Sequence, residues 1–532
     1  MDTLTSTYQI NKIAFREINL LKDIILDYLD QQTTIQPFYK HFPSLDNFEK
    51  ILQEQSFSSE KRKVLTQALT KQYSHLDLHE RVKDSIDKLA LDNTFTVTTG
   101  HQLSLFGGPL FFIYKIVSTI KATQLLQAKY PAYNFVPIFW MASEDHDFEE
   151  IATFHLFGKA YTWQSTQTGA VGRMHLEGIE EIIEALPEKL PLFEQAYLQQ
   201  ANLTNATRYL VNHLFEQYGL ICLDGDDPAL KRLFVPIMKE ELTDQPTSRL
   251  VQEQIDALIE QSYDIQANPR EINLFYLDEG IRERLVEEDN TYKVLNTPLS
   301  FNEEDILHLL EQSPEKFSPN ALLRPVYQEA ILPNLAYIGG AGELAYWFEL
   351  QSTFDHFKKY DADIMFPALM LRNMALILNN PNQSKFTKLG LTPEELFLDE
   401  VQLRKQWIAK NAAHQLDLST NKEQLVKVFE QIEQKALAVD QSMGKAVGAE
   451  AQKALKIVEN LEKRLVKAEE RNQETSINQL LNLKDKLFPN GTLQERYDSF
   501  LNFYINDDTW IEKVMAAFMP FDFCMYVLSE PI

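Results

Sequence analysis

The fold is decided by residues 95–142, which read FTVTTGHQLSLFGGPLFFIYKIVSTIKATQLLQAKYPAYNFVPIFWMA. The run 95–99 is typical of a β-strand and is followed by a glycine. Residues 110–129 read as a helix that begins just after Pro109, because proline is favoured near the first turn of a helix. Residues 135–142 are almost continuously apolar, as in a strand buried on both faces of a parallel sheet. Strand, helix and strand predict a βαβ unit and an α/β fold.

The same alternation continues further along the chain. Residues 219–224 predict another buried strand, and 337–340 predict a strand that leads through glycines into a helix over about 343–360. Residues 363–367 predict a last short strand. Inserted connecting segments, over about 155–335, are expected to hold short hairpin strands at 275–277 and 293–295.

A long helical arm is predicted after this core. Apolar residues at heptad spacing run through 425–443 and again through 447–468, with Gly444 between them where a hairpin tip would lie. We expect an antiparallel coiled-coil hairpin that makes a homodimer, or else an arm that packs only on itself. The predicted division is therefore an α/β core with N-terminal helices, a helical arm, and a C-terminal segment that packs back on the core, at residues 1–390, 391–489 and 490–532.

Composition limits the classes of function. The 532 residues include 51 Lys and Arg against 77 Asp and Glu, a net charge of −26, so an extended nucleic-acid or anionic membrane surface is disfavoured. The two cysteines, Cys222 and Cys524, lie among apolar residues and are expected to be free buried thiols. The first residues lack the pattern of a signal peptide, and no apolar run is long enough to span a bilayer. We expect a cytoplasmic protein.

A first candidate site follows the strand at 95–99. His101 and Gln102 come at the strand end, and Gly107 and Gly108 precede the next helix. Ligands bind beyond the carboxyl ends of parallel strands, and a helix N-terminus favours an anion. Lys115 in that helix is a candidate to add positive charge. The spacing matches neither a dinucleotide-binding fingerprint nor a P-loop, so a structural turn is an equal alternative.

A second candidate follows the strand at 135–142. Glu144, Asp145, His146 and Asp147 open a run that holds five carboxylates. A histidine among carboxylates is suited to proton transfer near neutral pH. The alternative is a solvated, acidic helix start. Because metal sites need spaced ligands, we expect no metal here.

Two further candidates lie late in the core. Gly339 and Gly340 follow a strand, and Glu343 with Trp347 opens the next helix. Glu343 is suited to binding an ammonium or a hydroxyl group; a tight turn into a packed aromatic helix is the alternative. Arg324 in Leu-Arg-Pro is suited to binding a substrate carboxylate, or it pairs with a carboxylate of the core.

Several segments together resemble the bacillithiol biosynthesis BshC family. They occur in the family's order over about 95–500, although His101 stands where many members have Gln and Ala341 where we expect Pro. The matching segments are Thr99-Gly100-His101-Gln102 with Phe106-Gly107-Gly108-Pro109, Pro137-Ile138-Phe139-Trp140 with 144–150, Phe317-Ser318-Pro319-Asn320 with Leu323-Arg324-Pro325-Val326, 336–340 with Gly342-Glu343 and Ala345-Tyr346-Trp347, and 487–491 with Leu493-Gln494-Glu495-Arg496.

The resemblance implies a Rossmann-like core, a coiled-coil arm that makes a homodimer, and a ligase that forms a carbon–nitrogen bond. It implies that L-cysteine is added to glucosaminyl-malate, the last step of bacillithiol synthesis. Because a carboxylate is a poor electrophile, we expect ATP to activate it. In this reading Asp145 and His146, with Glu144, do the acid–base work. The substrate-binding residues are then His101, Gln102, Gly107, Gly108, Lys115, Asp147, Arg324, Gly339, Gly340, Glu343 and Trp347.

Two rival functions stay open at this point. One is a nucleotidyl-transfer enzyme resembling class I aminoacyl-tRNA synthetases, although a Lys-Met-Ser-Lys-Ser segment is not evident and the acidic charge disfavours tRNA. The other is a non-catalytic dimeric scaffold built around the arm, which would leave the polar strand ends unexplained.

Overall fold

The computed structural model describes residues 8–412 and 417–531. The chain forms two compact units. The first comprises residues 1–376 with 493–528, and the second comprises 377–492 with 529–532. Residues 1–7, which belong to the stretch examined for a signal peptide, lie outside the described part.

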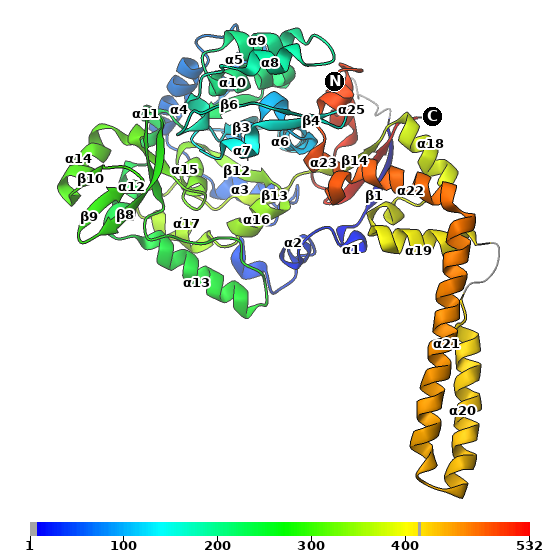
Figure 1. Cartoon of the computed structure of the whole chain (residues 1–532). Coiled ribbons are helices and arrows are strands. Elements are labelled where there is room, and N and C mark those ends of the chain that lie inside the picture. Colours follow the sequence, from blue (N-terminus) through cyan, green and yellow to red (C-terminus); the bar gives the residue numbers. More distant parts are fainter. Residues whose placement is uncertain (1–7, 413–416, 532) are drawn as a thin grey trace. The chain divides into compact units, whose positions relative to one another are not determined.

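A five-stranded parallel sheet forms the centre of the first unit (Figure 1). Numbered in chain order, its strands run 5-4-1-2-3 across the sheet, so the order reverses between β2 and β12. This reversal is the topological switch point at which Rossmann-like folds bind ligands. The strands, in sheet order, are β13 (Ala368–Leu371), β12 (Asn334–Gly339), β2 (Thr94–His101), β3 (Asn134–Met141) and β6 (Ile221–Asp224).

The buried threonines of β2 explain its pairing with β12. Thr96 and Thr98 both donate to the side-chain oxygen of Asn334, at 3.1 and 2.9 Å. Thr99 donates to the carbonyl oxygen of Ile338 at 2.7 Å. A buried hydroxyl costs free energy unless it is hydrogen-bonded, so these contacts favour this one register.

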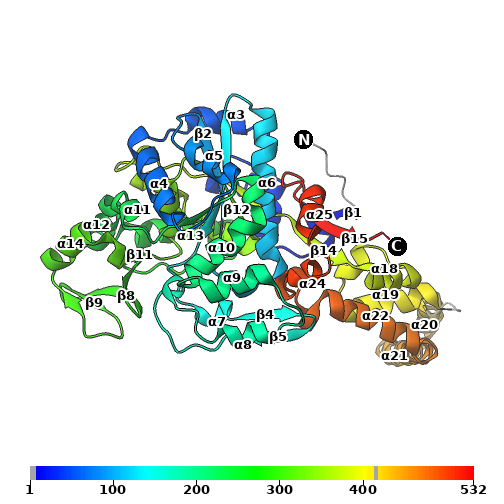
Figure 2. The ribbon, with the colours of Figure 1, turned by 90° about the horizontal axis from the view of Figure 1, so that it is seen from above.

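Helices cover the sheet as the βαβ pattern predicts. The helix α6 (Leu110–Lys129) packs against β2 and β3 (Figure 2). Most of its side chains are buried. The helix α3 (Phe48–Glu54) shares an apolar core with β2, β12 and β13. The unit β2–α6–β3 therefore confirms the strand, helix and strand predicted from residues 95–142.

The end of the core differs from the prediction in two places. The helix expected over 343–360 is two helices, α16 (Ala341–Trp347) and α17 (Gln351–Phe357). The strand expected at 363–367 is wrong, because pairing with β12 begins only at Ala368, directly after a proline. Proline has no backbone N–H to donate to a ladder, so a strand starts more readily after it.

The inserted segments hold a second five-stranded sheet, in the order β10-β9-β8-β7-β11. The hairpin predicted from 275–277 and 293–295 is wrong in detail, because a strand with five charged side chains, β8, lies between these two. Such a strand lacks a clear apolar signal. The strands are β7 (Leu274–Asp278), β8 (Ile281–Glu288), β9 (Thr291–Val294), β10 (Ser300–Phe301) and β11 (Phe317–Pro319).

Further elements complete the first unit, and a three-stranded sheet runs β1-β15-β14. The N-terminal region was predicted to contain helices alone. It begins instead with the strand β1, and helices follow it. These elements are β1 (Gln9–Ile13), α1 (Phe15–Ile18), α2 (Asp23–Leu29), α4 (Ser59–Gln72), α5 (Glu80–Lys88), α7 (Phe148–Ile151), β4 (Thr153–Leu156), β5 (Lys159–Thr162), α8 (Ile179–Glu184), α9 (Pro191–Gln199), α10 (Leu203–Phe215), α11 (Pro228–Arg232), α12 (Val235–Thr243), α13 (Pro246–Glu260), α14 (Glu303–Gln312), α15 (Arg324–Ile331), β14 (Met374–Leu378), α23 (Gln494–Tyr497), α24 (Leu501–Tyr504), α25 (Trp510–Ala517) and β15 (Met525–Ser529).

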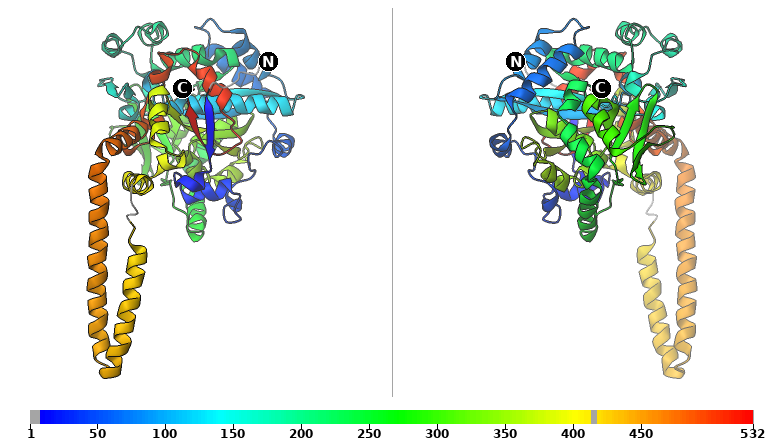
Figure 3. Two further views of the ribbon diagram at one scale, coloured as in Figure 1. Left: turned by 90° about the vertical axis from the view of Figure 1, so that its right-hand side faces the viewer. Right: turned by 90° about the vertical axis from the view of Figure 1, so that its left-hand side faces the viewer.

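The second unit is helical, and its long hairpin confirms the predicted coiled coil (Figure 3). The tip of the hairpin lies at 440–442, so Gly444 falls in the first turn of the second helix rather than at the tip. A side chain at Gly444 would lie 3.0 Å from Leu437, so glycine permits this close packing. The helices are α18 (Asn380–Leu389), α19 (Glu400–Asn411), α20 (Ser419–Val439), α21 (Met443–Asn472) and α22 (Glu474–Leu487).

Two other sequence predictions concern thiols and membranes. Cys222 is buried and Cys524 is partly buried, and both are free thiols. Within residues 8–412 and 417–531, every helix is too short or too polar to cross a bilayer.

Candidate functional site

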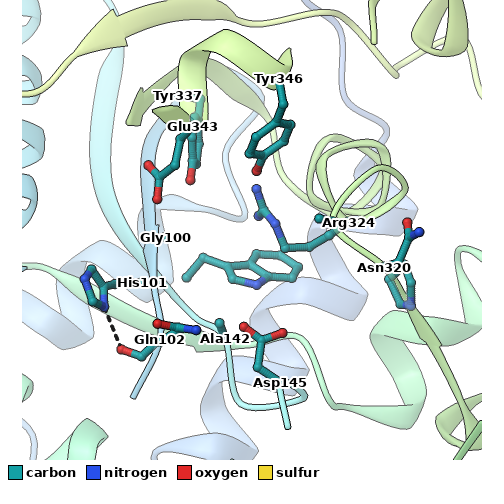
Figure 4. A pocket seen from close by; sticks show the side chains of 13 residues that line it. Gly100, His101, Gln102, Ala142, Asp145, Asn320, Arg324, Tyr337, Glu343 and Tyr346 are labelled. Carbon is teal, nitrogen blue, oxygen red and sulfur yellow. Dashed lines mark hydrogen bonds between the residues drawn. The ribbon is translucent and has the colours of Figure 1, made fainter. Parts of the chain in front are cut away.

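A pocket of about 160 Å³ lies at the switch point of the central sheet (Figure 4). It is formed where β2, β3 and β12 end and where α15 and α16 begin, so its walls come from segments far apart in the chain. The lining residues are Gly100, His101, Gln102, Trp140, Ala142, Asp145, Pro319, Asn320, Ala321, Arg324, Tyr337, Glu343 and Tyr346. Five predicted site residues are among them: His101, Gln102, Asp145, Arg324 and Glu343.

Arg324 places a cation at the wall of the pocket. Its Nη1 donates to the side-chain oxygen of Gln328 at 3.0 Å, whereas its Nη2 is buried without a hydrogen-bond partner among the described residues. The guanidinium lies over the rings of Trp140 and Tyr337, 5.7 and 5.5 Å from their centroids. Figure 4 shows it directed toward Tyr346. Tyr346 is also a side-chain hydrogen-bond partner of this guanidinium. An arginine so held at the wall of a cavity suits a carboxylate or phosphate oxygen.

Asp145 faces this pocket, whereas its neighbour His146 does not line it. Burial raises the pKa of the Asp145 carboxyl, and the nearby cation of Arg282 opposes that rise. Arg282 Nη2 lies 3.7 Å from Asp145 Oδ1, and its Nη1 lies 2.6 Å from His146 Nδ1. Asp147 starts α7 with a half-exposed side chain outside the pocket lining. A carboxylate with a raised pKa is suited to accept a proton near neutral pH.

Glu144 belongs to a buried ion-pair network instead of the pocket. Lys231 Nζ lies 2.7 Å from Glu144 and 2.9 Å from Asp226, and Asp226 also binds Arg173. Burial raises the pKa of Glu144, with Lys231 opposing. The network joins the ends of β3 and β6, so Glu144 makes a structural contact here, whereas the sequence predicted an acid–base role for it.

The buried Lys115 and the half-buried Glu343 form an ion pair that ties β2 to α16. Lys115 Nζ donates to the carbonyl of Gly100 at 2.7 Å and to Glu343 Oε1 at 2.5 Å. Glu343 Oε2 accepts from the backbone N–H of Gly340 at 2.9 Å. Burial alone would raise the pKa of Glu343, but Lys115 outweighs it and holds that pKa below its usual range. Lys115 thus orients Glu343, where the sequence predicted contact with an anionic ligand.

His101 and Gln102 are joined by a hydrogen bond at the end of β2. The carbonyl of Gln102 accepts from His101 Nδ1 at 2.8 Å, which leaves Nε2 as the acceptor nitrogen of a neutral ring. Burial, together with Lys115, lowers the pKa of His101 to about 3. The Gln102 amide donates to Glu150 at 2.7 Å.

The glycine turn before α6 does not fit an anion. The first helical N–H, that of Leu110, donates to the carbonyl of Asp498 at 2.8 Å. A side chain at Gly107 would meet the Phe500 ring at 2.6 Å, and one at Gly108 would meet Ser104 at the same distance. Both glycines have positive φ, so they serve a tight turn covered by the chain itself.

The second glycine turn also has a structural role. Gly339 lets Glu343 fold back, since a Cβ there would lie 3.0 Å from its Oε2. Trp347 is fully buried and stacks on Tyr337 at 4.4 Å between ring centroids, so Trp347 supports the pocket wall without reaching the cavity. Neither Gly339 nor Gly340 lines the pocket.

Sequence reasoning missed several residues of the site. Trp140, Asn320, Tyr337 and Tyr346 line the pocket, and Arg282 lies behind its acidic loop. Trp140 and Tyr337 had a usable signal, because both lie in predicted strands that lead into candidate sites. Arg282 had none, because it comes from an unpredicted strand. The described residues contain no group of three or more His, Cys, Asp or Glu arranged to hold a metal.

The parallel sheet with one reversal of strand order, and the polar pocket above it, define a Rossmann-like α/β protein. The chain belongs to the BshC family of bacillithiol biosynthesis. The family's N-terminal Rossmann-like domain matches residues 8–373, and its C-terminal coiled-coil domain matches residues 375–530.

Relatives from other bacteria agree with this membership. A protein of Flavobacterium johnsoniae named "Putative cysteine ligase BshC" is 45% identical over 93% of this chain and 94% of its own. Proteins of the same name from Flavobacterium psychrophilum and Christiangramia forsetii are 44% and 41% identical, over 96% and 98% of this chain and 97% and 99% of their own.

Proposed function

We propose that this chain is a ligase that joins the carboxyl group of L-cysteine to the amino group of glucosaminyl-malate, the last step of bacillithiol synthesis. Membership of the BshC family and the name of its relatives, putative cysteine ligase, support the reaction class. The observation that carries the proposal is the switch-point pocket, which places carboxylates and an incompletely paired arginine around one small cavity.

The pocket has the groups that this reaction needs. A sugar ammonium becomes a nucleophile only after it loses a proton, and Asp145, whose pKa is raised by burial, accepts that proton. Arg324, which Tyr346 helps to hold at the pocket wall, binds a carboxylate of one substrate through its guanidinium. Glu343, oriented by Lys115, accepts a hydrogen bond from an ammonium or hydroxyl group.

A volume of about 160 Å³ is enough for an amino acid or for one end of the sugar substrate. The cavity therefore takes the reacting groups, and the rest of the larger substrate extends past its mouth. Asp145 and Glu343 approach from opposite sides in Figure 4, so a ligand between them meets both carboxylates.

Activation of the cysteine carboxylate calls for ATP, which supplies a phosphoryl or adenylyl leaving group. Neither glycine turn fits its phosphates: the start of α6 is occupied by Asp498 and Phe500, and the N–H of Gly340 is taken by Glu343. We therefore propose ATP dependence on chemical grounds and assign the nucleotide to neither turn.

We also propose a homodimer through the α20–α21 hairpin. The two helices of the hairpin leave apolar side chains at their seam partly exposed to solvent, and a second copy of the hairpin would cover these side chains. The structure gives α20 and α21 no fully buried residue. Their exposed apolar side chains include Val428, Ile432, Ile457, Leu461 and Leu465, at 43–61% exposure.

The test of the function uses the purified full chain with L-cysteine, glucosaminyl-malate and ATP, and product detection by mass spectrometry. Formation of the cysteinyl amide with consumption of ATP is expected. Product that forms equally without ATP would contradict nucleotide activation. In cells, a deletion strain is expected to accumulate glucosaminyl-malate and to lack bacillithiol. Unchanged bacillithiol in that strain would contradict the pathway assignment, provided that no second enzyme of the same activity is present.

A further inference from the structure

The acidic loop after β3 comprises residues 144–147. Within the described residues, one ion pair joins the inserted sheet to this loop, and Arg282 makes it with Asp145. Arg282 stands on β8 opposite Leu277 of β7, and its side chain is only 6% exposed. The guanidinium lies over the ring of Phe275, 4.0 Å from the centroid. This stacking fixes the plane of the guanidinium and leaves its terminal nitrogens directed at the loop.

The contact with His146 determines where the imidazole proton sits. Arginine keeps its protons at all ordinary pH values, so at 2.6 Å Nη1 must donate and His146 Nδ1 must accept. His146 is then a neutral ring with its proton on Nε2. The nearest carboxylate to that nitrogen is Asp147 Oδ1, at 3.8 Å. Both nitrogens are thus assigned before any substrate binds.

The same guanidinium acts on Asp145. Its Nη2 lies 3.7 Å from Asp145 Oδ1, and Nε is buried without a hydrogen-bond partner among the described residues. Other titratable or charged groups that face Asp145 are Asp147 and His146 on its own loop and Arg324 on α15. Glu144, which is paired with Lys231, faces Arg282. Among the groups around Asp145, Arg282 opposes protonation of this carboxyl most strongly.

We propose that Arg282 is a positioning residue for the ligation. It holds His146 in the Nε2–H tautomer, which excludes His146 Nδ1 as a base, and it keeps Asp145 ionised to accept the proton of the attacking ammonium. This proposal rests on the proposed function for the role of Asp145, but the tautomer of His146 is independent of any activity. It also gives the inserted sheet a role, since β8 delivers the guanidinium from outside the Rossmann-like core.

The first test is the tautomer of His146 in the full chain. Histidine is labelled with nitrogen-15, and the His146 signals are assigned with the variant His146→Gln. At alkaline pH the wild type is expected to show the Nε2–H tautomer alone, and Arg282→Met a mixture of both. A wild-type Nδ1–H tautomer, or an unchanged tautomer in Arg282→Met, would overturn the proposal.

The second test is the pH dependence of kcat/KM for ligation. In Arg282→Met the acid limb of the kcat/KM profile is expected to move to higher pH by about one unit. This value is at the low end of the effect of an adjacent charge, because the Asp145 side chain is 37% exposed to solvent. Arg282→Lys keeps the charge and should move the limb less. The control is Arg284→Met, on the same strand, for which the structure gives no contact with Asp145 or His146. Equal pH profiles for Arg282→Met and Arg284→Met would refute the role.

Failure of the two proposals can be told apart. If the wild type does not ligate but the tautomer changes as expected, the proposed function fails and the positioning contact stands. If ligation proceeds and Arg282→Met alters neither tautomer nor pH profile, the positioning role fails alone. Melting temperatures of all variants separate these results from loss of folding.

Discussion

Glu329 offers a test of the buried layer behind the pocket. It lies on α15, and its Oε1 accepts from Gln328 and Asn334, each at 2.8 Å, whereas Oε2 is buried without a hydrogen-bond partner among the described residues. Burial raises the pKa of Glu329 to about 8 despite these donors. The native state therefore keeps this proton at neutral pH, whereas the unfolded chain releases it near pH 4.5.

The sign and size of the effect follow from proton linkage. Because the native state holds the proton more tightly, the free energy of unfolding falls as pH rises from about 4.5 to about 8. The difference between the two pKa values corresponds to about 5 kcal/mol over that window, of which about 3–4 kcal/mol falls between pH 5 and pH 8. For a unit of this size, a change of that magnitude shifts the melting temperature by about 4 °C.

The perturbation is Glu329→Gln, which keeps Oε1 for both donors and cannot ionise. Melting temperatures of the variant and the wild type are measured across pH 5 to 8, and their difference cancels the titration of all other groups. The variant is expected to gain about 4 °C relative to the wild type over this range. Parallel curves for the two proteins would refute the inference that Glu329 is protonated in the native state.

Three other predictions concern packing and assembly. Lys115→Met is expected to lower the free energy of unfolding by about 3 kcal/mol, because it leaves Glu343 without its cation. The double variant with Glu343→Gln should recover most of the lost melting temperature. Additive losses in the two single variants and the double variant would contradict the pairing. Gly107→Ala is expected to lower the free energy of unfolding by about 2–4 kcal/mol, because its Cβ would meet Phe500 at 2.6 Å and φ at this position is +76°. In the control Gly342→Ala the new Cβ meets no atom within 4 Å, so thermal melting should show a stability within about 1 kcal/mol of the wild type. Leu461→Lys is expected to convert a dimer into a monomer in sedimentation, and a wild type that sediments as a monomer would contradict the proposed interface.

The sequence predicted the fold where one segment carries its own signal. The unit β2–α6–β3 follows from a strand pattern, a proline before the helix and a continuous apolar run, all within 50 residues. The strand β8 was missed because its charged residues include Arg282, whose burial depends on Phe275 and on the acidic loop. Local pattern cannot show that a charged side chain will be buried by a partner distant in sequence.

The site was predicted in part for the same reason. Asp145 and Glu343 were placed at strand ends, which is where the pocket lies. The role expected of Lys115 is not supported, because its partner Glu343 stands 228 residues later and becomes its neighbour only when β12 pairs with β2. The order of strands, and hence the position of the switch point, is a tertiary property that a single segment does not contain.

The central claim is that the switch-point pocket forms the amide bond and that Asp145 takes the proton. The most direct measurement is the rate of ATP-dependent ligation of L-cysteine and glucosaminyl-malate by the full chain. The variants are Asp145→Asn and, as a matched control, Glu149→Gln, an exposed carboxylate on α7 outside the pocket lining. Asp145→Asn is expected to lower kcat by about 10²–10⁴-fold, with the melting temperature retained, while Glu149→Gln ligates at the wild-type rate. Equal rates for Asp145→Asn and the wild type would contradict the account.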